Sequence, residues 1–144
     1  MGQTPFSREA VVEQEERPRI VVTAAVIERA GRFLLTRRLG GTHLAGHWEF
    51  PGGKRDAGET LEDSLRREIR EELDAEVEVG EEILSTAHDY ADRRIELRFF
   101  RCRLTSTPRP VLGQEIRWVP RTRLNTLPLP PADDELVRLL MDQK

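Results

Sequence analysis

Apolar residues fall into short runs along the chain, and the pattern within each run predicts its secondary structure. Residues 20–27, IVVTAAVI, are almost all apolar or β-branched, which is typical of a strand buried on both faces. A turn at Gly31 leads into residues 33–38, FLLTRR, which predict a strand returning beside the first. Shorter or alternating patterns predict further strands at residues 48–53, 75–83, 93–104 and 115–120.

Two segments have the spacing of amphipathic helices. Residues 60–73 open with Thr60 and Asp63, which resemble a capping box, and then place an apolar residue at every fourth position. Residues 130–141 open with prolines and a capping aspartate, after which apolar residues gather on one face. Strands on both sides of a central helix, with a second helix at the end, predict an α/β fold in which helices sandwich a mixed sheet.

The length and composition predict one domain. Residues 1–17 are polar and rich in acids, so we expect a flexible N-terminal tail there and a single domain over residues 18–144. The net charge of −3 provides no basic surface for a stable nucleic-acid partner. The one cysteine, Cys102, fits a reducing cytoplasm as a buried thiol, and no apolar run is long enough to span a membrane. We expect a cytoplasmic protein, either a monomer or a homodimer.

The central helix carries acids beside its apolar stripe. At about 100° per residue, Glu68 falls about 20° to one side of the stripe, Glu72 about 20° to the other and Glu71 about 80° away. A solvated face of paired charges is the ordinary explanation for such a helix. Here, however, Glu68 faces both other glutamates at spacings that cost roughly a few tenths of a kcal/mol each. The stripe itself comprises Leu61, Leu65, Ile69 and Leu73.

A divalent cation would convert this repulsion into shared coordination. All candidate ligands are oxygens, which favours a hard ion, Mg²⁺ first and Mn²⁺ as a possible substitute. Gly52 and Gly53 precede the helix and let the backbone pass close to its face, so that a carbonyl there can also reach the ion. Because Mg²⁺ is commonly held by a few carboxylates together with substrate phosphates, the segment predicts a metal–phosphate site.

The same segment resembles the Nudix box, G-x5-E-x7-R-E-U-x-E-E-x-G-U, in which U is aliphatic. Asp74 replaces the last glycine and Ala75 the last aliphatic residue, and since aspartate tolerates left-handed backbone geometry we expect intact chemistry. The motifs LLTRR, WEFPGGK, DRR and LPPAD are similar to those of the MutT-like branch of nucleotide-pool-cleaning diphosphatases. The residues that match the box are Gly53, Glu59, Arg67, Glu68, Ile69, Glu71 and Glu72.

The resemblance implies an α/β/α sandwich that hydrolyses a nucleoside triphosphate to a nucleoside monophosphate and pyrophosphate. The implied role is sanitation of oxidised purine or cytosine nucleotides, with metal ions neutralising phosphate charge. Glu68 is the implied general base, with Glu59 as the alternative. Arg67 is implied to orient the glutamates through charge-assisted hydrogen bonds, unless it is an ordinary surface arginine. The implied metal ligands are Glu68, Glu71, Glu72 and the carbonyl of Gly52.

Further residues are implied to contact a small-molecule nucleotide. Arg38 is placed to contact a phosphate, with Lys54 in support, and Arg93 stands in the DRR motif before a strand. Phe50 could line the base pocket while Trp48 packs elsewhere, or both could be ordinary core residues.

Asp133 ends the LPPAD motif, where the resemblance places an asparagine that reads the edge of an oxidised guanine. An ionised Asp133 can only accept, which suits the exocyclic amino group of cytosine, whereas a protonated one could also donate. A capping role at the start of the terminal helix is the alternative. The branch's additional downstream glutamate aligns with Leu112, and whether the nearby Glu115 supplies that contact is open.

Two other functions fit parts of the pattern. A Nudix hydrolase of a nucleotide sugar or a dinucleoside polyphosphate would use the same box, because the box handles only the diphosphate. A non-catalytic Nudix-like module that binds nucleotide or nucleic acid characteristically loses box glutamates. This chain retains all of them together with Arg67, which favours an enzyme.

Overall fold

A computed structural model describes residues 18–143, so the predicted tail of residues 1–17 lies outside the described part of the chain. Within residues 18–143, the strands form one mixed sheet in which β1 and β6 are parallel and the other pairs are antiparallel. The strands are β1 Arg19–Arg29, β2 Arg32–Arg37, β3 Trp48–Glu49, β4 Gly52–Lys54, β5 Val77–Asp89, β6 Arg94–Leu104 and β7 Ile116–Pro120.

The first strand, β1, connects the two halves of the sheet. The strand order is β3-β2-β1-β6-β5, with β4 added beside β1 and β7 beside β2. β1 pairs with β6 along most of its length and with β4 at Val22, Thr23 and Ala24, and then with β2 from Glu28 onward. This course places the two glycines of β4 next to the centre of the molecule.

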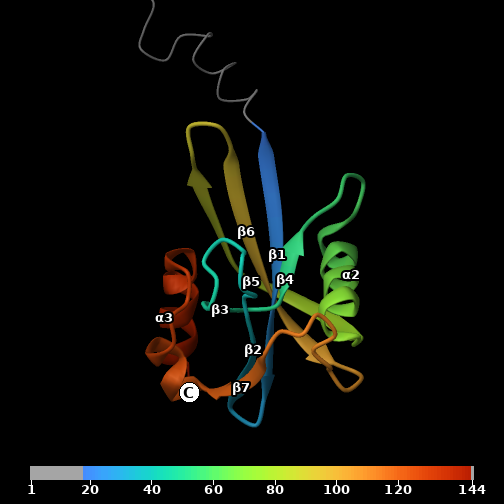
Figure 1. Cartoon of the computed structure of the whole chain (residues 1–144), viewed down its shortest axis with the longest axis vertical. Coiled ribbons are helices and arrows are strands. Elements are labelled where there is room, and N and C mark those ends of the chain that lie inside the picture. The colour runs from blue at the N-terminus through green and yellow to red at the C-terminus, as the bar shows by residue number, and fades with distance from the viewer. Residues whose placement is uncertain (1–17, 144) are drawn as a thin grey trace, which may run out of the picture.

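Helices cover opposite faces of the sheet, as the α/β/α prediction requires. α2, Leu61–Leu73, lies on one side and α3, Asp134–Asp142, on the other (Figure 1). Two short 3₁₀ helices, η1 Arg121–Thr126 and η2 Pro131–Asp133, precede α3. Neither α2 nor α3, the α-helices among residues 18–143, has the length and apolar character needed to cross a bilayer.

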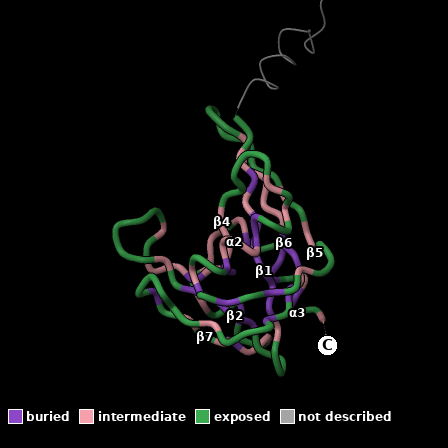
Figure 2. Tube along the Cα trace, turned by 90° about the vertical axis from the view of Figure 1, so that its right-hand side faces the viewer, coloured by how far each residue is buried: buried purple, intermediate pink, exposed green. Residues whose placement is uncertain are grey.

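The core has two parts, one beneath each helix. Ala24 and Val26 of β1 pack in the part that includes α3, whereas Ala25 and Ile27 pack in the part that includes α2. Successive side chains of a strand point to opposite faces, so the apolar run predicted to be buried on both sides at residues 20–27 is confirmed. Buried positions follow β1 and β2 through the middle of the molecule (Figure 2).

The predicted boundaries differ from the structure in three places. The strand expected at residues 75–83 continues to Asp89, because pairing with β6 extends it through a weak apolar pattern. The strand expected at residues 48–53 divides at Pro51, which has no N–H to donate. The terminal helix begins only at Asp134, after η2, and no pattern in the sequence predicted η1.

Candidate active site

Gly52 and Gly53 bring β4 into close contact with both the sheet and α2. A Cβ atom at Gly52 would lie 1.9 Å from the main-chain oxygen of Thr23 on the neighbouring β1. A Cβ atom at Gly53 would lie 2.4 Å from Cδ of Glu68. The Glu68 carboxylate therefore packs directly on the β4 main chain, which confirms the close approach predicted for the glycine pair.

Both ends of α2 have the predicted capping geometry. At the N-terminus, the Thr60 hydroxyl accepts a hydrogen bond of 3.1 Å from the Asp63 amide. At the C-terminus, Asp74 adopts the left-handed conformation, with φ of 48° and ψ of 44°. The aspartate that departs from the Nudix box thus ends the helix as a glycine would.

Arg67 holds three glutamates of the box by charge-assisted hydrogen bonds. Its Nε and Nη2 donate to the two carboxylate oxygens of Glu59, at 2.8 and 2.9 Å. Its Nη1 donates to Glu68 at 3.0 Å and to Glu71 at 3.2 Å. These bonds lower the pKa of Glu59, to which the Asp56 amide also donates. The predicted orienting contacts of Arg67 are therefore present in the structure.

Glu72, the remaining acid of the box, lacks such a partner. No salt bridge to Glu72 occurs within residues 18–143, and burial, followed by the charges of Glu68 and Glu49, raises its pKa to about 8. The main chain of Gly52 donates a hydrogen bond that acts in the opposite direction. Burial also raises the pKa of Asp133 to about 7, with a further contribution from Glu49. The charge of Glu49 therefore raises the pKa both of Glu72, the metal-site candidate, and of Asp133, the base-pocket candidate.

A cavity of about 680 Å³ joins these acids to the other predicted substrate contacts. Gly52 and Glu72 line one part of it, whereas Glu59, Arg67, Glu68 and Glu71 are not among its lining residues. All five residues predicted to bind substrate line the same cavity: Arg38, Phe50, Lys54, Arg93 and Asp133. Residues from β1, β4, α2, the β5–β6 hairpin and the η2 region therefore meet in one site.

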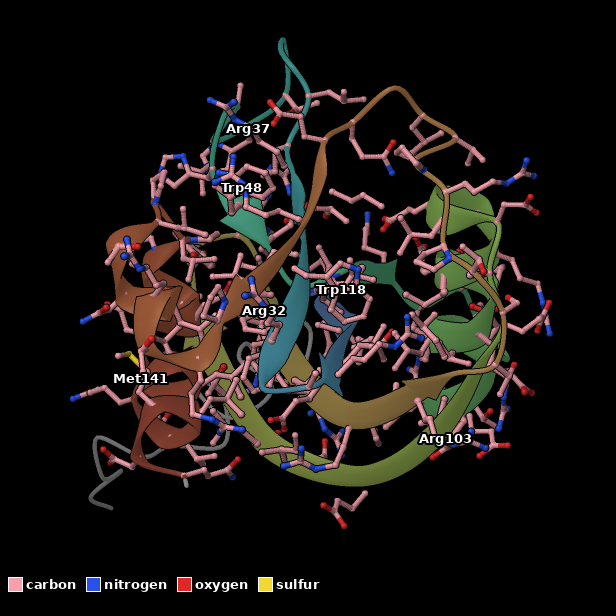
Figure 3. All side chains as sticks on the ribbon, turned by 90° about the horizontal axis from the view of Figure 1, so that it is seen from below. Arg32, Arg37, Trp48, Arg103, Trp118 and Met141 are labelled. Carbon is pink, nitrogen blue, oxygen red and sulfur yellow. The ribbon has the colours of Figure 1, made fainter. Side chains whose placement is uncertain are left out.

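The two aromatic residues around Glu49 have different surroundings. Phe50 lines the cavity and contacts Phe99 edge to face, with ring centroids 6.3 Å apart. Trp48 is buried in the core with Arg37 beside it (Figure 3), and the guanidinium of Arg37 lies 5.8 Å from its ring centroid. The guanidinium of Arg117 lies 4.7 Å from the same centroid. Both residues are therefore part of the core, and of the two only Phe50 lines the cavity.

Comparison with known proteins identifies the family. The family model of the NUDIX domain matches residues 22–139, which is most of the chain. This chain belongs to the Nudix family. The CTP pyrophosphohydrolase of Escherichia coli K12 is 37% identical to it over 123 residues, 85% of this chain and 91% of that protein. The 8-oxo-dGTP diphosphatase of Haemophilus influenzae is 35% identical over 126 residues, 86% and 93% of the two chains.

Solved structures agree with the Nudix assignment. The solution structure of the E. coli ORF135 protein has a TM-score of 0.80 and 35% identity, covering 88% of this chain and 91% of that one. A MutT protein from Methanosarcina mazei has a TM-score of 0.75 and 25% identity, over 87% of this chain and 94% of its own. The protein is a Nudix hydrolase with the α/β fold predicted from its sequence.

The donor atoms of the site fit the divalent cation that Nudix hydrolases generally require. Among residues 18–143, no three acidic, histidine or cysteine side chains lie in an arrangement that could hold a metal ion. The donors are nevertheless all oxygens, and Glu72 is a half-buried carboxylate whose charge is offset by no salt bridge within those residues. Oxygen donors of this kind suit a hard divalent cation.

The structure bears on two alternatives that the sequence left open. The side chain of Asp133 is buried and makes no capping hydrogen bond to α3, so it does not cap that helix. Glu115 forms a salt bridge of 2.9 Å with Arg37 and does not line the cavity, and its contribution to a metal site stays open. Cys102 is buried in β6 with its pKa raised by burial to about 12, which confirms a buried, unreactive thiol.

Among the residues of the cavity wall that the sequence did not point to are two polar ones, Glu49 and Gln114. Glu49 pairs with Arg38 at 2.9 Å, and burial raises its pKa. The sequence feature that could have indicated Glu49 is a carboxylate between two aromatic residues in a short apolar strand. Gln114 is buried, and nothing in its local sequence distinguished it from a loop residue.

Proposed function

We propose that this Nudix hydrolase converts a nucleoside triphosphate to a nucleoside monophosphate and pyrophosphate, with a cytosine or an oxidised purine as the base. One observation carries the proposal. A single cavity extends from Glu72, at the metal end, to Asp133 and Phe50, where a flat base can lie between polar and aromatic groups. Relatives named CTP pyrophosphohydrolase and 8-oxo-dGTP diphosphatase support both base classes.

At the metal end, Glu68, Glu71 and Glu72 with the Gly52 carbonyl are the proposed ligands for Mg²⁺, with Mn²⁺ as a possible substitute. The bound ion would supply charge neutralisation and a more acidic water. Glu68 is the better candidate than Glu59 to accept the proton of the attacking water. Both oxygens of Glu59 already accept hydrogen bonds from Arg67, which lowers its pKa, whereas burial raises that of Glu68.

Cationic side chains at the cavity wall are the proposed phosphate contacts. Lys54 follows the glycine pair, and Arg93 stands at the β5–β6 hairpin, where it stacks on Tyr90 at 5.5 Å. Arg38 donates to the His43 carbonyl at 2.6 Å and to Glu49 at 2.9 Å, which keeps its guanidinium at the cavity wall. Together they would place positive charge opposite the acids of α2.

The base is proposed to meet Asp133 and Glu49. A carboxylate accepts from the exocyclic amino group of cytosine. A carboxylic acid can donate as well as accept, which suits the edge of an oxidised purine. Because the pKa of Asp133 is raised to about 7, both protonation states are accessible near neutral pH. We therefore expect Asp133 and Glu49 to bind either a cytosine or an oxidised purine in the same pocket.

The test is a hydrolysis screen with and without Mg²⁺. The panel contains normal, oxidised and methylated nucleoside triphosphates, nucleotide sugars and dinucleoside polyphosphates, each ranked by kcat/KM. We expect release of pyrophosphate only with metal, and the highest kcat/KM for a cytosine or oxidised purine triphosphate. A higher kcat/KM for a nucleotide sugar or a dinucleoside polyphosphate would overturn the proposal while leaving the Nudix assignment intact.

A further inference from the structure

Residues 105–115 connect β6 to β7 and are here called the strap. The strap is hydrogen-bonded to the C-terminal end of α2. The last carbonyls of a helix have no partner within the helix. Here the Arg109 amide donates to the Leu73 carbonyl at 2.7 Å, and the Val111 amide donates to the Glu72 carbonyl at 3.3 Å. The Arg109 side chain also pairs with Asp74, the residue that departs from the Nudix box. The strap therefore supplies partners that α2 lacks at the acidic end of the site.

Gln114 adds a side-chain contact at the same point. Its Nε2 donates to the Glu72 carbonyl at 2.8 Å, and its Oε1 accepts from the Leu112 amide at 2.9 Å. The side chain is buried, with 7% of the residue exposed, whereas Leu112 is 54% exposed and lines the cavity. One amide group thus links a proposed metal ligand to a residue of the cavity wall.

We propose that Gln114 is a positioning residue, which fixes the main chain of Glu72 for metal binding and holds Leu112 against the substrate. The inference rests on the metal role proposed for Glu72. The two hydrogen bonds of the Gln114 amide serve different residues. The NH₂ group, the donor half, donates to the Glu72 carbonyl, and the oxygen, the acceptor half, accepts from the Leu112 amide. Removing the donor alone in one variant and both halves in another therefore separates metal binding from substrate binding.

Two variants make that separation. Gln114→Glu keeps an oxygen for the Leu112 amide but sets a second oxygen against the Glu72 carbonyl, which removes the donor. Gln114→Met has a similar length and removes both halves. Ser106→Ala is the matched control, since the Ser106 hydroxyl accepts from the Glu76 amide at 2.8 Å in the same strap, away from Glu72.

Three measurements are compared: Mg²⁺ affinity by calorimetry, amide hydrogen exchange in the metal-free protein, and KM for the best triphosphate at saturating Mg²⁺. We expect both Gln114 variants to bind Mg²⁺ roughly five- to tenfold more weakly, as loss of one hydrogen bond predicts. Only Gln114→Met should raise KM and speed exchange of the Leu112 amide. Ser106→Ala should match wild type in all three measurements.

The inference is overturned if Gln114→Glu and Gln114→Met both bind Mg²⁺ as wild type does, or if Ser106→Ala loses as much affinity as they do. If Gln114→Glu does not fold, by circular dichroism, Gln114→Met alone decides through the same affinity measurement. Glu72→Gln separates this outcome from failure of the proposed function. Unchanged Mg²⁺ binding in Glu72→Gln would refute the metal site itself, whereas loss there with intact binding in the Gln114 variants refutes only the positioning role.

Discussion

Two neighbouring groups of carboxylates differ in how their charge is balanced. In the first, here called the Arg67 group, Glu59, Glu68 and Glu71 share hydrogen bonds from one guanidinium. In the second, the cavity group of Glu72, Glu49 and Asp133, the charge of Glu49 raises the pKa of the other two acids, and the salt bridge from Arg38 reaches only Glu49.

The pKa values follow this difference only in part. Hydrogen bonds from Arg67 lower the pKa of Glu59, whereas burial raises those of all three acids in the cavity group and also that of Glu68, the most buried member of the Arg67 group. Burying like charges close together destabilises a protein, and such acids with shifted pKa values are common at functional sites. The Arg67 group holds the shape of the site, and the cavity group is the part that a cation and a base would complete.

The largest effect is expected from removing a charge in the cavity group. Glu72→Gln removes a proposed metal ligand, and we expect kcat/KM to fall by at least roughly a hundredfold, the loss seen for one well-placed electrostatic contact. Without metal, the variant should melt at the same temperature as wild type or higher, because like-charge repulsion is relieved. Steady-state kinetics and thermal melts in chelator measure both.

Mg²⁺ should also raise the melting temperature of wild type more than that of Glu72→Gln, since a ligand stabilises the state that binds it. Equal shifts in the two proteins, or near-wild-type turnover in the variant, would contradict the assignment of Glu72.

A change in the Arg67 group should affect stability as well as turnover. Arg67→Gln leaves Glu59, Glu68 and Glu71 without their shared donor, so we expect a roughly 10- to 100-fold loss of activity. We also expect a melting temperature lower by roughly 3 to 8 °C, as loss of hydrogen bonds to charged groups predicts. Arg70→Gln is a matched control, because Arg70 bonds the exposed Glu76 away from the cavity. A similar loss in Arg70→Gln would mean that the effect belongs to the helix and not to the site.

A smaller effect, confined to base selection, is expected at the far end of the cavity group. Asp133→Asn keeps the size of the side chain but adds a permanent donor, which should shift the substrate ranking toward oxidised guanine by about tenfold. Asp133→Ala should reduce discrimination among bases. The measurement is kcat/KM across the triphosphate panel. One unchanged ranking for wild type and both variants would place base selection elsewhere in the pocket.

The smallest expected effect is the pH dependence of metal-free stability. Glu72 and Asp133 have folded pKa values of about 8 and about 7, above their unfolded values near 4.5 and 3.8. The folded state therefore binds protons more tightly, and their contribution to stability is present at low pH and lost as pH rises through about 4 to 8. In chelator, the wild-type melting temperature should fall by roughly a few degrees between pH 5 and 8. A double variant, Glu72→Gln with Asp133→Asn, should show a smaller fall, and an equal fall would refute the raised pKa values as its cause.

Much of the fold was determined by local pattern in the sequence. The run at residues 20–27 predicted a strand buried on both faces, and Leu65, Ile69 and Leu73 predicted the buried stripe of α2. The placement of Glu68 beside that stripe follows from helical periodicity alone. These features depend on neighbours within a few residues, which is why they are readable without a structure.

Site residues carried by the Nudix box were also accessible from the sequence, because their spacing lies within one loop and one helix. The resemblance implied that Arg67 orients the glutamates, and the structure contains its hydrogen bonds to Glu59, Glu68 and Glu71. By contrast, the sequence left open whether Asp133 was a cap or part of a pocket. Only its burial, and the lack of a capping hydrogen bond, decided between them.

Tertiary structure alone decided which distant residues share the cavity and how they titrate. Arg38, Arg93 and Asp133 come together because the sheet, the β5–β6 hairpin and η2 pack around one space. Glu49 lies between Glu72 and Asp133 for the same reason. Burial and through-space charge depend on segments far apart in the chain, which no local periodicity encodes, so the raised pKa values of the cavity group follow only from the packed structure.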